Sequence, residues 1–267
     1  MFQVQHCLPF VNQSWLIKQF IHIQFDDSYF EEKFIPRPDI SIIFHFKTMP
    51  LITADKSILL EPFFATPIIS KSLFIKLHGN LDSFIVSCKP SVFSRIFHLD
   101  LSHVQQTIPL PRHLFYPLWE QLSKLKTNYE RIILFTHFIE EYHRHAYVPD
   151  TIDLLYDKIT TDGLTKLLKD IKYDCPACQR TLERNFIKRT GVTPKKLMRI
   201  MRIDQLLAKI DKNKSIEYQE LVFNGRYFDQ AHFINDFKSI IDETPSFFFK
   251  RDINSTKMIS GRIEGQL

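Results

Sequence analysis

Glycine is scarce in this sequence, with only six among 267 residues. Neither GxGxxG nor GxxxxGK(S/T) occurs, which excludes the common glycine-rich loops that cradle nucleotide phosphates. Cysteine is also rare, with four residues at positions 7, 88, 175 and 178. A secreted disulfide scaffold of this size usually needs more, so we expect a protein of the reducing cytoplasm.

Long hydrophobic runs are absent as well, and we expect no signal peptide at the start of this sequence. No apolar run approaches the roughly 18–20 residues that cross a membrane, and residues 1–6 lack the basic start and apolar core of a signal peptide. No GxSxG, HExxH or specific carboxylate pair occurs, so we expect no catalytic site. We expect no metal, because Cys175 and Cys178 lack a second CxxC or HxxxH nearby. We also expect no cofactor. We interpret this pair as two free thiols, with a thiol switch as the alternative hypothesis.

Positive charge is unevenly distributed along the chain. The formal net charge is +5, yet residues 1–160 hold 15 Lys and Arg against 16 Asp and Glu. Residues 161–267 hold 20 against 14, so the whole basic excess lies in this second part. Such an asymmetry indicates a nucleic-acid or membrane partner for the basic part.

The first 90 residues have the pattern of short strands joined by turns. Hydrophobic residues alternate over 20–25, and the apolar run 40–46 follows a PRPD turn signal. Residues 73–77 and 83–87 flank the sequence HGNLD and predict a hairpin. Strand histidines such as His22 and His45 are candidates to line a ligand cavity. We therefore expect a mainly β domain, either a barrel or a sandwich.

The apolar period changes to that of amphipathic helices farther along the chain. Residues 114–125 and 131–142 have apolar positions three and four apart. Asp150 or Thr151 can cap a further helix. The pattern stays helical to about residue 251, and the remaining tail is expected to be frayed or loosely packed.

Two segments of the basic part follow the same pattern. Residues 178–194 align without a gap with residues 229–245, which superposes Phe186 on Phe237. Each unit predicts a short helix with an apolar pair four apart, then a turn residue that tolerates positive φ. A Thr N-cap with Pro at the first position of the next helix ends each unit. The turn residues are Gly191 and Asp242, and the Thr-Pro pairs are Thr193-Pro194 and Thr244-Pro245.

A short helix before each segment would complete a helix-turn-helix, whose second helix can enter the major groove. The apolar residues Leu167, Leu168 and Ile171 mark the first such helix, and Ile216, Leu221 and Val222 mark the second. Outward polar side chains on the second helix of each unit are the candidates for base contact, because Arg suits guanine, Asn and Gln suit adenine and Glu suits cytosine. These candidates are Arg180, Glu183 and Arg184 in the first unit, and Gln230, His232 and Asn235 in the second.

These motifs resemble the DNA-binding domain of AraC/XylS-type transcriptional regulators over residues 162 to 251. The specific matches are YFDQAHFINDFK (227–238) and RTLERNF (180–186), each followed by its Thr-Pro pair. The resemblance implies two helix-turn-helix units joined by a long helix over residues 194 to about 210. It also implies phosphate contacts, which set affinity and register rather than sequence choice. The candidates are Gln179, Thr181, Lys188, Lys195, Lys196, Arg199, Arg202, Lys238 and Thr244.

Several positions depart from the family pattern. Arg226 stands where a turn glycine is usual, and Asn235 replaces a frequent arginine. Asp236 adds negative charge beside Asn235, and Cys178 takes the usual Ser/Thr N-cap position of the first reading helix. We therefore expect the first unit and the joining helix to supply most of the salt-dependent affinity.

The expected fold class is α+β with two domains. A β-rich sensory or dimerisation domain would span 1–148 with a helical segment at 112–146, an AraC-type double helix-turn-helix domain would span 149–253, and a tail would span 254–267. The resemblance implies a cytoplasmic, non-enzymatic regulator that binds specific DNA sequences near promoters. It implies double-stranded DNA as partner and no membrane, with RNA polymerase, an unidentified small-molecule effector and a second copy of the chain as further candidate partners.

Two other interpretations stay open. The N-terminal domain could be a ligand-binding protein or an enzyme, with the helical part as an adaptor. DNA-repair methyltransferases use similar units, but they need a four-cysteine zinc cluster, and only Cys7 and Cys88 lie in the first half. Alternatively, Asn235, Asp236 and Arg226 suggest a protein-binding module whose DNA contacts have lapsed. Zinc content and selection of genomic DNA fragments separate these interpretations.

Overall fold

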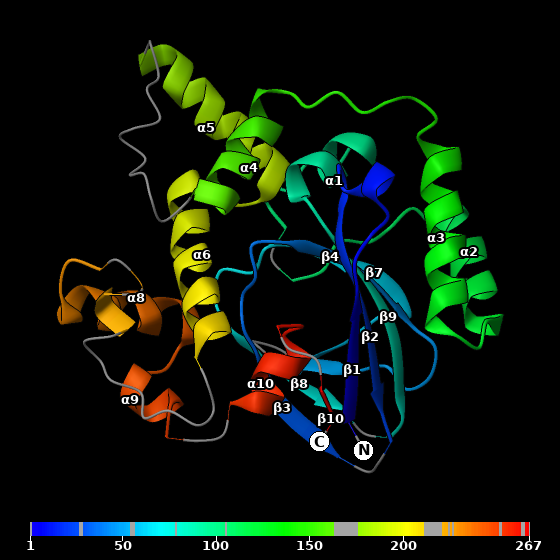
Figure 1. The fold of residues 1–267 in the computed structure, drawn as a ribbon, viewed down its shortest axis with the longest axis horizontal. Helices are drawn as coiled ribbons and strands as arrows, with labels where there is room; N and C mark the ends of the chain where they lie inside the picture. Colours follow the sequence, from blue (N-terminus) through cyan, green and yellow to red (C-terminus); the bar gives the residue numbers. More distant parts are fainter. Residues whose placement is uncertain are drawn as a thin grey trace.

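The computed structural model describes residues 2–26, 29–53, 57–77, 79–104, 106–162, 176–210, 221–223, 225, 227–250, 253–262 and 265–266. A β-rich N-terminal domain lies beside a helical C-terminal domain (Figure 1). In the described ranges, no helix combines the length and the apolar character that a bilayer-spanning segment needs. The expected fold class is confirmed.

Two antiparallel sheets form the N-terminal domain. The larger has the order β10-β1-β2-β9-β4-β7, and the smaller has the order β3-β8-β5-β6. A short 3-10 turn, Val11–Gln13, follows β1. The strands of the larger sheet are β1 (Phe2–Cys7), β2 (Ile17–Phe25), β4 (Ile40–His45), β7 (Phe63–Thr66), β9 (Leu81–Cys88) and β10 (Gly265–Gln266). Those of the smaller sheet are β3 (Phe30–Phe34), β5 (Leu51–Thr53), β6 (Ser57–Leu59) and β8 (Leu73–Leu77).

The predicted hairpin of residues 73–77 and 83–87 is wrong. Both segments are strands, but β8 pairs with β3 and β5, whereas β9 lies between β2 and β4 in the other sheet. Strand β9 is buried on both faces, so it is best placed at the centre of a sheet with a partner on each side. Local alternation identifies a strand but does not identify its partner.

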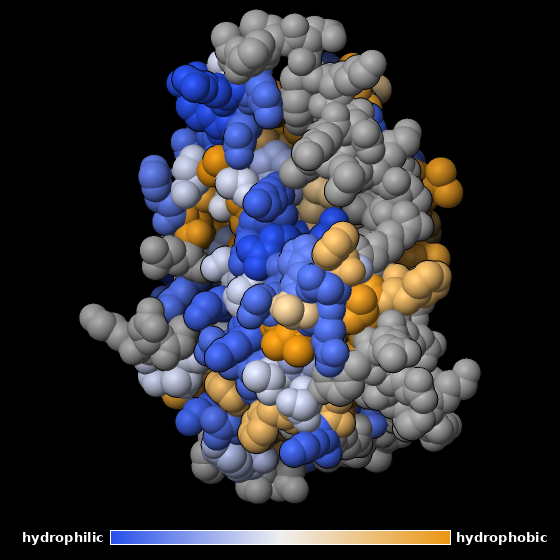
Figure 2. All heavy atoms as spheres, turned by 90° about the vertical axis from the view of Figure 1, so that its left-hand side faces the viewer, coloured by the Kyte–Doolittle hydropathy of each residue, from blue (hydrophilic) through white to orange (hydrophobic). Residues whose placement is uncertain are grey.

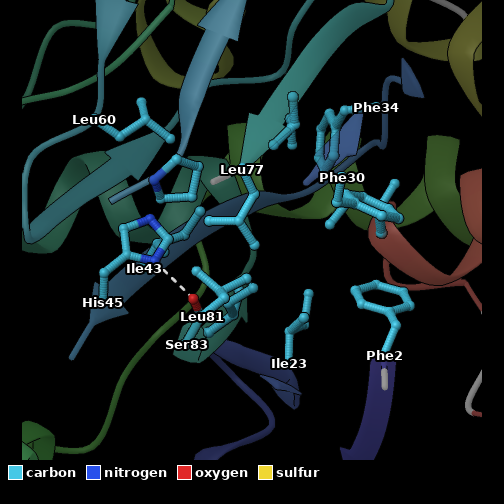
Figure 3. Close-up of a pocket in the computed structure, with 14 residues that line it drawn as sticks. Phe2, Ile23, Phe30, Phe34, Ile43, His45, Leu60, Leu77, Leu81 and Ser83 are labelled. Atoms are coloured by element: carbon cyan, nitrogen blue, oxygen red, sulfur yellow. Dashed lines mark hydrogen bonds between the residues drawn. The ribbon is translucent and has the colours of Figure 1, made fainter. Parts of the chain in front are cut away.

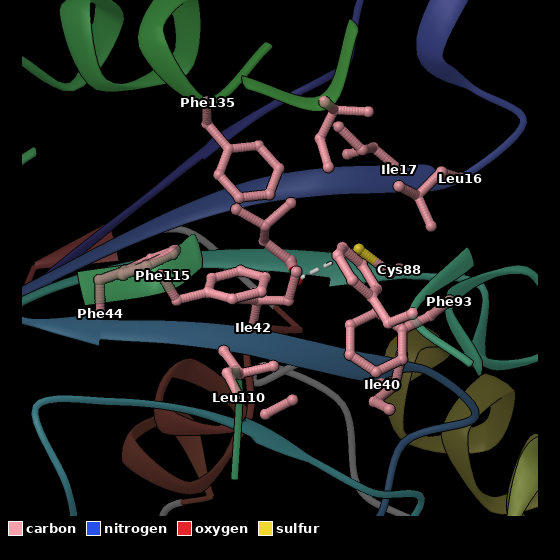
Figure 4. Packing of buried hydrophobic residues seen from close by; sticks show 14 of the residues in the cluster. Leu16, Ile17, Ile40, Ile42, Phe44, Cys88, Phe93, Leu110, Phe115 and Phe135 are labelled. Carbon is pink, nitrogen blue, oxygen red and sulfur yellow. Dashed lines mark hydrogen bonds between the residues drawn. The ribbon is translucent and has the colours of Figure 1, made fainter. Parts of the chain in front are cut away.

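Aromatic side chains fill the core between the larger sheet and three helices. These helices are α1 (Pro90–Ile96), α2 (Arg112–Lys124) and α3 (Asn128–Tyr142), and α2 and α3 correspond to predicted helices. Figure 4 shows Phe44, Phe115 and Phe135 gathered at the sheet. The ring of Phe44 lies 6.4 Å from that of Phe115 and 6.1 Å from that of Phe135, centre to centre. Each ring is fully buried, as expected for phenylalanine that packs a core.

A separate core holds the C-terminal helices together. They are α4 (Thr151–Asp162), α5 (Pro176–Thr190), α6 (Pro194–Lys209), α8 (Gln230–Ile241) and α9 (Pro245–Phe248), and residues 221–223 are also helical. Asp150 caps α4, because its Oδ1 accepts from the backbone N–H groups of Ile152 and Asp153 at 2.9 and 3.0 Å. The expected joining helix is α6. Leu167, Leu168, Ile171, Cys175, Ile216 and Arg226 lie outside the described residues.

The C-terminal segment packs firmly, so the expectation of a loose tail is wrong. Helix α10 (Asn254–Ile259) is buried along its length, and β10 extends the larger sheet beside β1. The Arg262 guanidinium is 3% exposed and pairs with Asp204 of α6 at 2.9 Å. Arg37 donates to the carbonyls of Ser260 and Gly261. The partners of this segment lie far away in sequence, so its own short pattern gives no sign of them.

Candidate nucleic-acid interface

The backbone repeats between the two predicted units. Gly191 has φ 79° and Asp242 has φ 63°, so both turn residues adopt the left-handed conformation. Phe186 and Phe237 are fully buried at equivalent places. Thr193 caps α6 by accepting from the N–H of Lys196 at 3.1 Å, and Thr244 occupies the N-cap of α9. The left-handed turn residues and the Thr-Pro positions predicted for both units are confirmed, but of the two threonines only Thr193 makes a side-chain cap hydrogen bond.

The first reading helix is α5. It begins at Pro176, so the prediction that Cys178 is its N-cap is wrong. Phe186 is buried and Leu182 is half-buried against the C-terminal core. The opposite face is exposed to solvent, and it carries the predicted residues Gln179, Arg180, Thr181, Glu183, Arg184 and Lys188.

The second reading helix is α8. Its N-terminus is capped by Asp229, whose Oδ1 accepts from the N–H of His232 at 2.7 Å. Phe233 and Phe237 are fully buried, with ring centres 5.7 Å apart. The outward face is again exposed, and it carries Gln230, His232, Asn235 and Lys238.

Asp236 does not belong to the outward face. Its side chain is 3% exposed and forms an ion pair with Arg199 of α6. The hydroxyl of Tyr227 donates to Asp236 Oδ2 at 3.0 Å. Burial and the adjacent Asp236 raise the pKa of Tyr227, which therefore keeps its proton as a donor. The negative charge predicted beside Asn235 is therefore buried and paired with Arg199 rather than exposed on the reading face.

The four basic candidates on the joining helix have different surroundings. Lys195 is exposed, whereas Lys196 is half-buried, and burial together with the nearby Arg199 lowers its pKa. Arg199 is held by Asp236 and donates to Ser239 Oγ. The guanidinium of Arg202 lies over the ring of Tyr227, 5.7 Å from its centre. Arg199 and Arg202 therefore hold α6 against the second unit.

Sequence reasoning missed the part that Asp236 plays. A signal for it exists, because Asp236 follows the buried Phe233 by three positions and so lies on the inner side of α8. A carboxylate on an inner face needs a cationic or hydrogen-bonding partner. The identity of that partner depends on how α6 and α8 pack.

The N-terminal domain holds the end of the first reading helix. The N–H of Leu101 donates to the carbonyl of Lys188 at 2.8 Å. The guanidinium of Arg189 bridges Asp150 and Asp153 at 2.8 and 2.9 Å. It also donates to the carbonyl of Ser91 in α1 at 2.6 Å.

The end of the second reading helix is held in the same way. The backbone N–H of Ser72 donates to the carbonyl of Ile240 at 2.8 Å. The Ser72 hydroxyl donates to the carbonyl of Ile241 at 2.5 Å. Lys33 of β3 donates to the carbonyl of Ile241 at 3.0 Å and pairs with Glu243. The equivalent ends of both reading helices are thus fixed to the N-terminal domain, which the sequence did not indicate.

A cleft of about 570 Å³ separates the domains at these two attachment points. Lys33, Ser70 and Gln106 contribute to its wall from the N-terminal domain. Gly191 and Asp242, the two turn residues, contribute from the C-terminal domain.

A second cavity lies inside the N-terminal domain. It measures about 60 Å³ and is lined mainly by apolar side chains, with His45 and Ser83 at one end (Figure 3). His45 Nδ1 lies 2.6 Å from Ser83 Oγ, and burial lowers the pKa of His45 to about 3. His22, by contrast, is buried against Asp82 at 2.9 Å. His45 therefore borders this cavity, whereas His22 is not part of its lining.

Comparison with known proteins identifies the C-terminal domain. Residues 177–251 match the family model described as a helix-turn-helix domain, of the AraC type. No curated protein matches the chain.

Solved structures with a related arrangement have low similarity. ToxT from Vibrio cholerae aligns with a TM-score of 0.46 and 11% identity, covering 93% of this chain and 98% of that chain. Unsaturated fatty acid-bound wild-type ToxT from Vibrio cholerae strain SCE256 aligns with a TM-score of 0.43 and 15% identity, over 100% of this chain and 97% of that chain. The AraC-like transcriptional activator CuxR aligns with a TM-score of 0.29 and 13% identity, covering 78% of this chain and 87% of that chain. The family model and the repeated units together show that the chain is a DNA-binding transcriptional regulator with a helix-turn-helix domain of the AraC/XylS type.

Proposed function

We propose that α5 and α8 enter successive major-groove segments of promoter DNA, with residues 149–253 as the DNA-binding domain. The repeated geometry of α5 and α8, each with one buried and one exposed face and each followed by a left-handed turn residue, carries this proposal. The N-terminal residues of a reading helix contact base edges. Arg180, Glu183 and Arg184 would read one segment, and Gln230, His232 and Asn235 would read the other.

We assign the phosphate contacts to the exposed part of the predicted set. Lys188, Lys195 and Lys238 are exposed cations, and Gln179 and Thr181 flank the first reading face. Arg199, Arg202 and the half-buried Lys196 and Thr244 would act by positioning the units. Salt dependence should therefore come mostly from α5 and the start of α6, because each phosphate contact releases counterions.

Replacing Arg184 by alanine should weaken specific DNA binding by about 1–3 kcal/mol, roughly 5- to 150-fold. Arg184 is exposed on α5, so the loss should come without a change in stability. Binding to a selected operator, measured at fixed salt by gel shift and footprinting, tests this prediction. Asn185→Ala, an exposed neighbour, is the matched control. Specific affinity within twofold of the wild type in Arg184→Ala would contradict the assignment of this helix.

We further propose that a polar small-molecule effector occupies the interdomain cleft. Its volume lies within the range of about 300–1,000 Å³ for small-molecule sites. An occupant would touch the turn residues that follow both reading helices, so it could change how the units are held. A thermal-shift screen of polar metabolites tests this: a stabilising compound should lose its effect in Ser70→Trp, which fills the cleft, and keep it in the surface control Ser123→Trp. A retained effect in Ser70→Trp would rule the cleft out.

The other partners rest on the resemblance alone. We propose RNA polymerase and a second copy of the chain as partners. We also propose that the protein acts in the cytoplasm and has no catalytic activity. The adaptor interpretation predicts instead that the full chain selects no DNA.

A further inference from the structure

An aromatic ring projects from the start of the second reading helix. Phe228 is 93% exposed, the highest value among the large hydrophobic residues of the described ranges. It directly precedes Asp229, the N-cap of α8. Figure 2 shows hydrophobic side chains interrupting the hydrophilic surface on this side of the molecule. The ring therefore lies at the N-terminal end of α8, where an exposed side chain can reach the DNA that this helix would read.

The residues on either side of Phe228 are anchored. Tyr227 is 7% exposed, its ring centre lies 5.3 Å from that of Phe233, and its hydroxyl is bound to Asp236. Asp229 is held by its hydrogen bond to the N–H of His232. Because the chain is fixed before and after Phe228, the ring is presented at a defined place beside α8.

The chemistry of the major groove limits what such a ring can contact. A phenyl ring has no charge and no hydrogen-bond donor or acceptor for a phosphate oxygen or for the polar edge of a base. The C5-methyl group of thymine is the apolar group in the major groove, and phenylalanine is one of the side chains that contact it. We propose that Phe228 packs against a thymine methyl and makes the second unit select thymine at one position. This proposal rests on the proposed function, because it requires α8 in the major groove.

The rest of the second reading face agrees with this assignment. Gln230 and Asn235 are neutral amides, and the buried Asp236 is neutralised by Arg199. A face with few cations gains little from counterion release, so its discrimination must come from base contacts. An apolar contact of Phe228 with thymine adds discrimination that does not depend on salt.

Thymine-to-deoxyuridine substitution tests the proposal, because it removes only the methyl group. The full chain is first used to select its operator, and footprinting then locates the segment covered by the second unit. Each thymine there is replaced singly by deoxyuridine. At one position, wild-type affinity should fall roughly fourfold, the value for one buried methyl group at about 0.8 kcal/mol. Phe228→Ala should bind the thymine and deoxyuridine operators equally well.

Two further variants separate this effect from a general one. Phe228→Leu keeps an apolar side chain and should retain part of the deoxyuridine penalty. Phe223→Ala removes another exposed ring, 82% accessible and outside α8, and should retain the full penalty. The proposal is overturned if Phe228→Ala shows the wild-type deoxyuridine profile, or if no thymine methyl matters to the wild type. Failure of the wild type to select any DNA would overturn the proposed function itself, and this proposal with it.

Discussion

Replacing Asp236 by alanine should destabilise the protein by about 3–5 kcal/mol, the usual result of removing one partner of a buried ion pair. Asp236 is 3% exposed and accepts from both Arg199 and Tyr227. Without it, the buried Tyr227 hydroxyl loses its acceptor and Arg199 loses its counter-charge. Helices α6 and α8 are joined through this carboxylate, so both units should loosen together. Urea unfolding followed by circular dichroism measures the change.

Two matched variants sharpen this result. Asp236→Asn keeps the shape and an acceptor for the Tyr227 hydroxyl, so it should cost less than alanine. Asn235→Ala alters the exposed neighbour and should leave the unfolding free energy within about 0.5 kcal/mol of the wild type. A loss below about 1 kcal/mol for Asp236→Ala would show that the ion pair does not hold the two units together.

Replacing Arg189 by alanine should have an effect of similar size, again about 3–5 kcal/mol. Its guanidinium joins the end of α5 to Asp150, to Asp153 and to the carbonyl of Ser91. The Asp153 side chain is 3% exposed and would lose the hydrogen bond and positive charge that Arg189 supplies to its Oδ1 at 2.9 Å. We expect the first unit to detach from α1 before the N-terminal domain unfolds.

Amide hydrogen exchange locates this detachment. The N–H of Leu101 donates to the carbonyl of Lys188, so its exchange should accelerate in Arg189→Ala. Lys188→Ala is the control: its side chain is 59% exposed and 3.9 Å from Asp100, so it should change stability little. Unchanged Leu101 exchange in Arg189→Ala would contradict the role of this arginine as the link between the domains.

The repeated units could be predicted from sequence because their signals are local. A left-handed residue at 191 or 242 and a Thr-Pro pair two residues later depend on the backbone nearby. The buried Phe186 and Phe237 follow from helical period alone. These features fix where each reading helix ends and which face it exposes, and the base-contact candidates lie on that exposed face.

The remaining features depend on partners that are distant in sequence. Strand β9 lies between β2 and β4 because the whole domain places it there, although β8 precedes it directly. Arg262 is buried only because Asp204 and the carbonyl of Pro36 lie opposite it. In the sequence, Arg199 has the character of an exposed cation that can bind phosphate. In the structure, α8 packs against α6 and Asp236 forms an ion pair with Arg199. Tertiary packing therefore decides which charges remain available for DNA.

Selection of genomic DNA fragments by the full chain, followed by footprinting, tests the central claim most directly. We expect enriched fragments with two protected major-groove segments about one helical turn, roughly 10 base pairs, apart. Enrichment should be lost in the double variant Arg180→Ala and Arg184→Ala, which removes two exposed side chains of α5. Equal recovery of fragments by the wild type and this variant, or no enrichment by the wild type, would contradict DNA recognition by the two helix-turn-helix units.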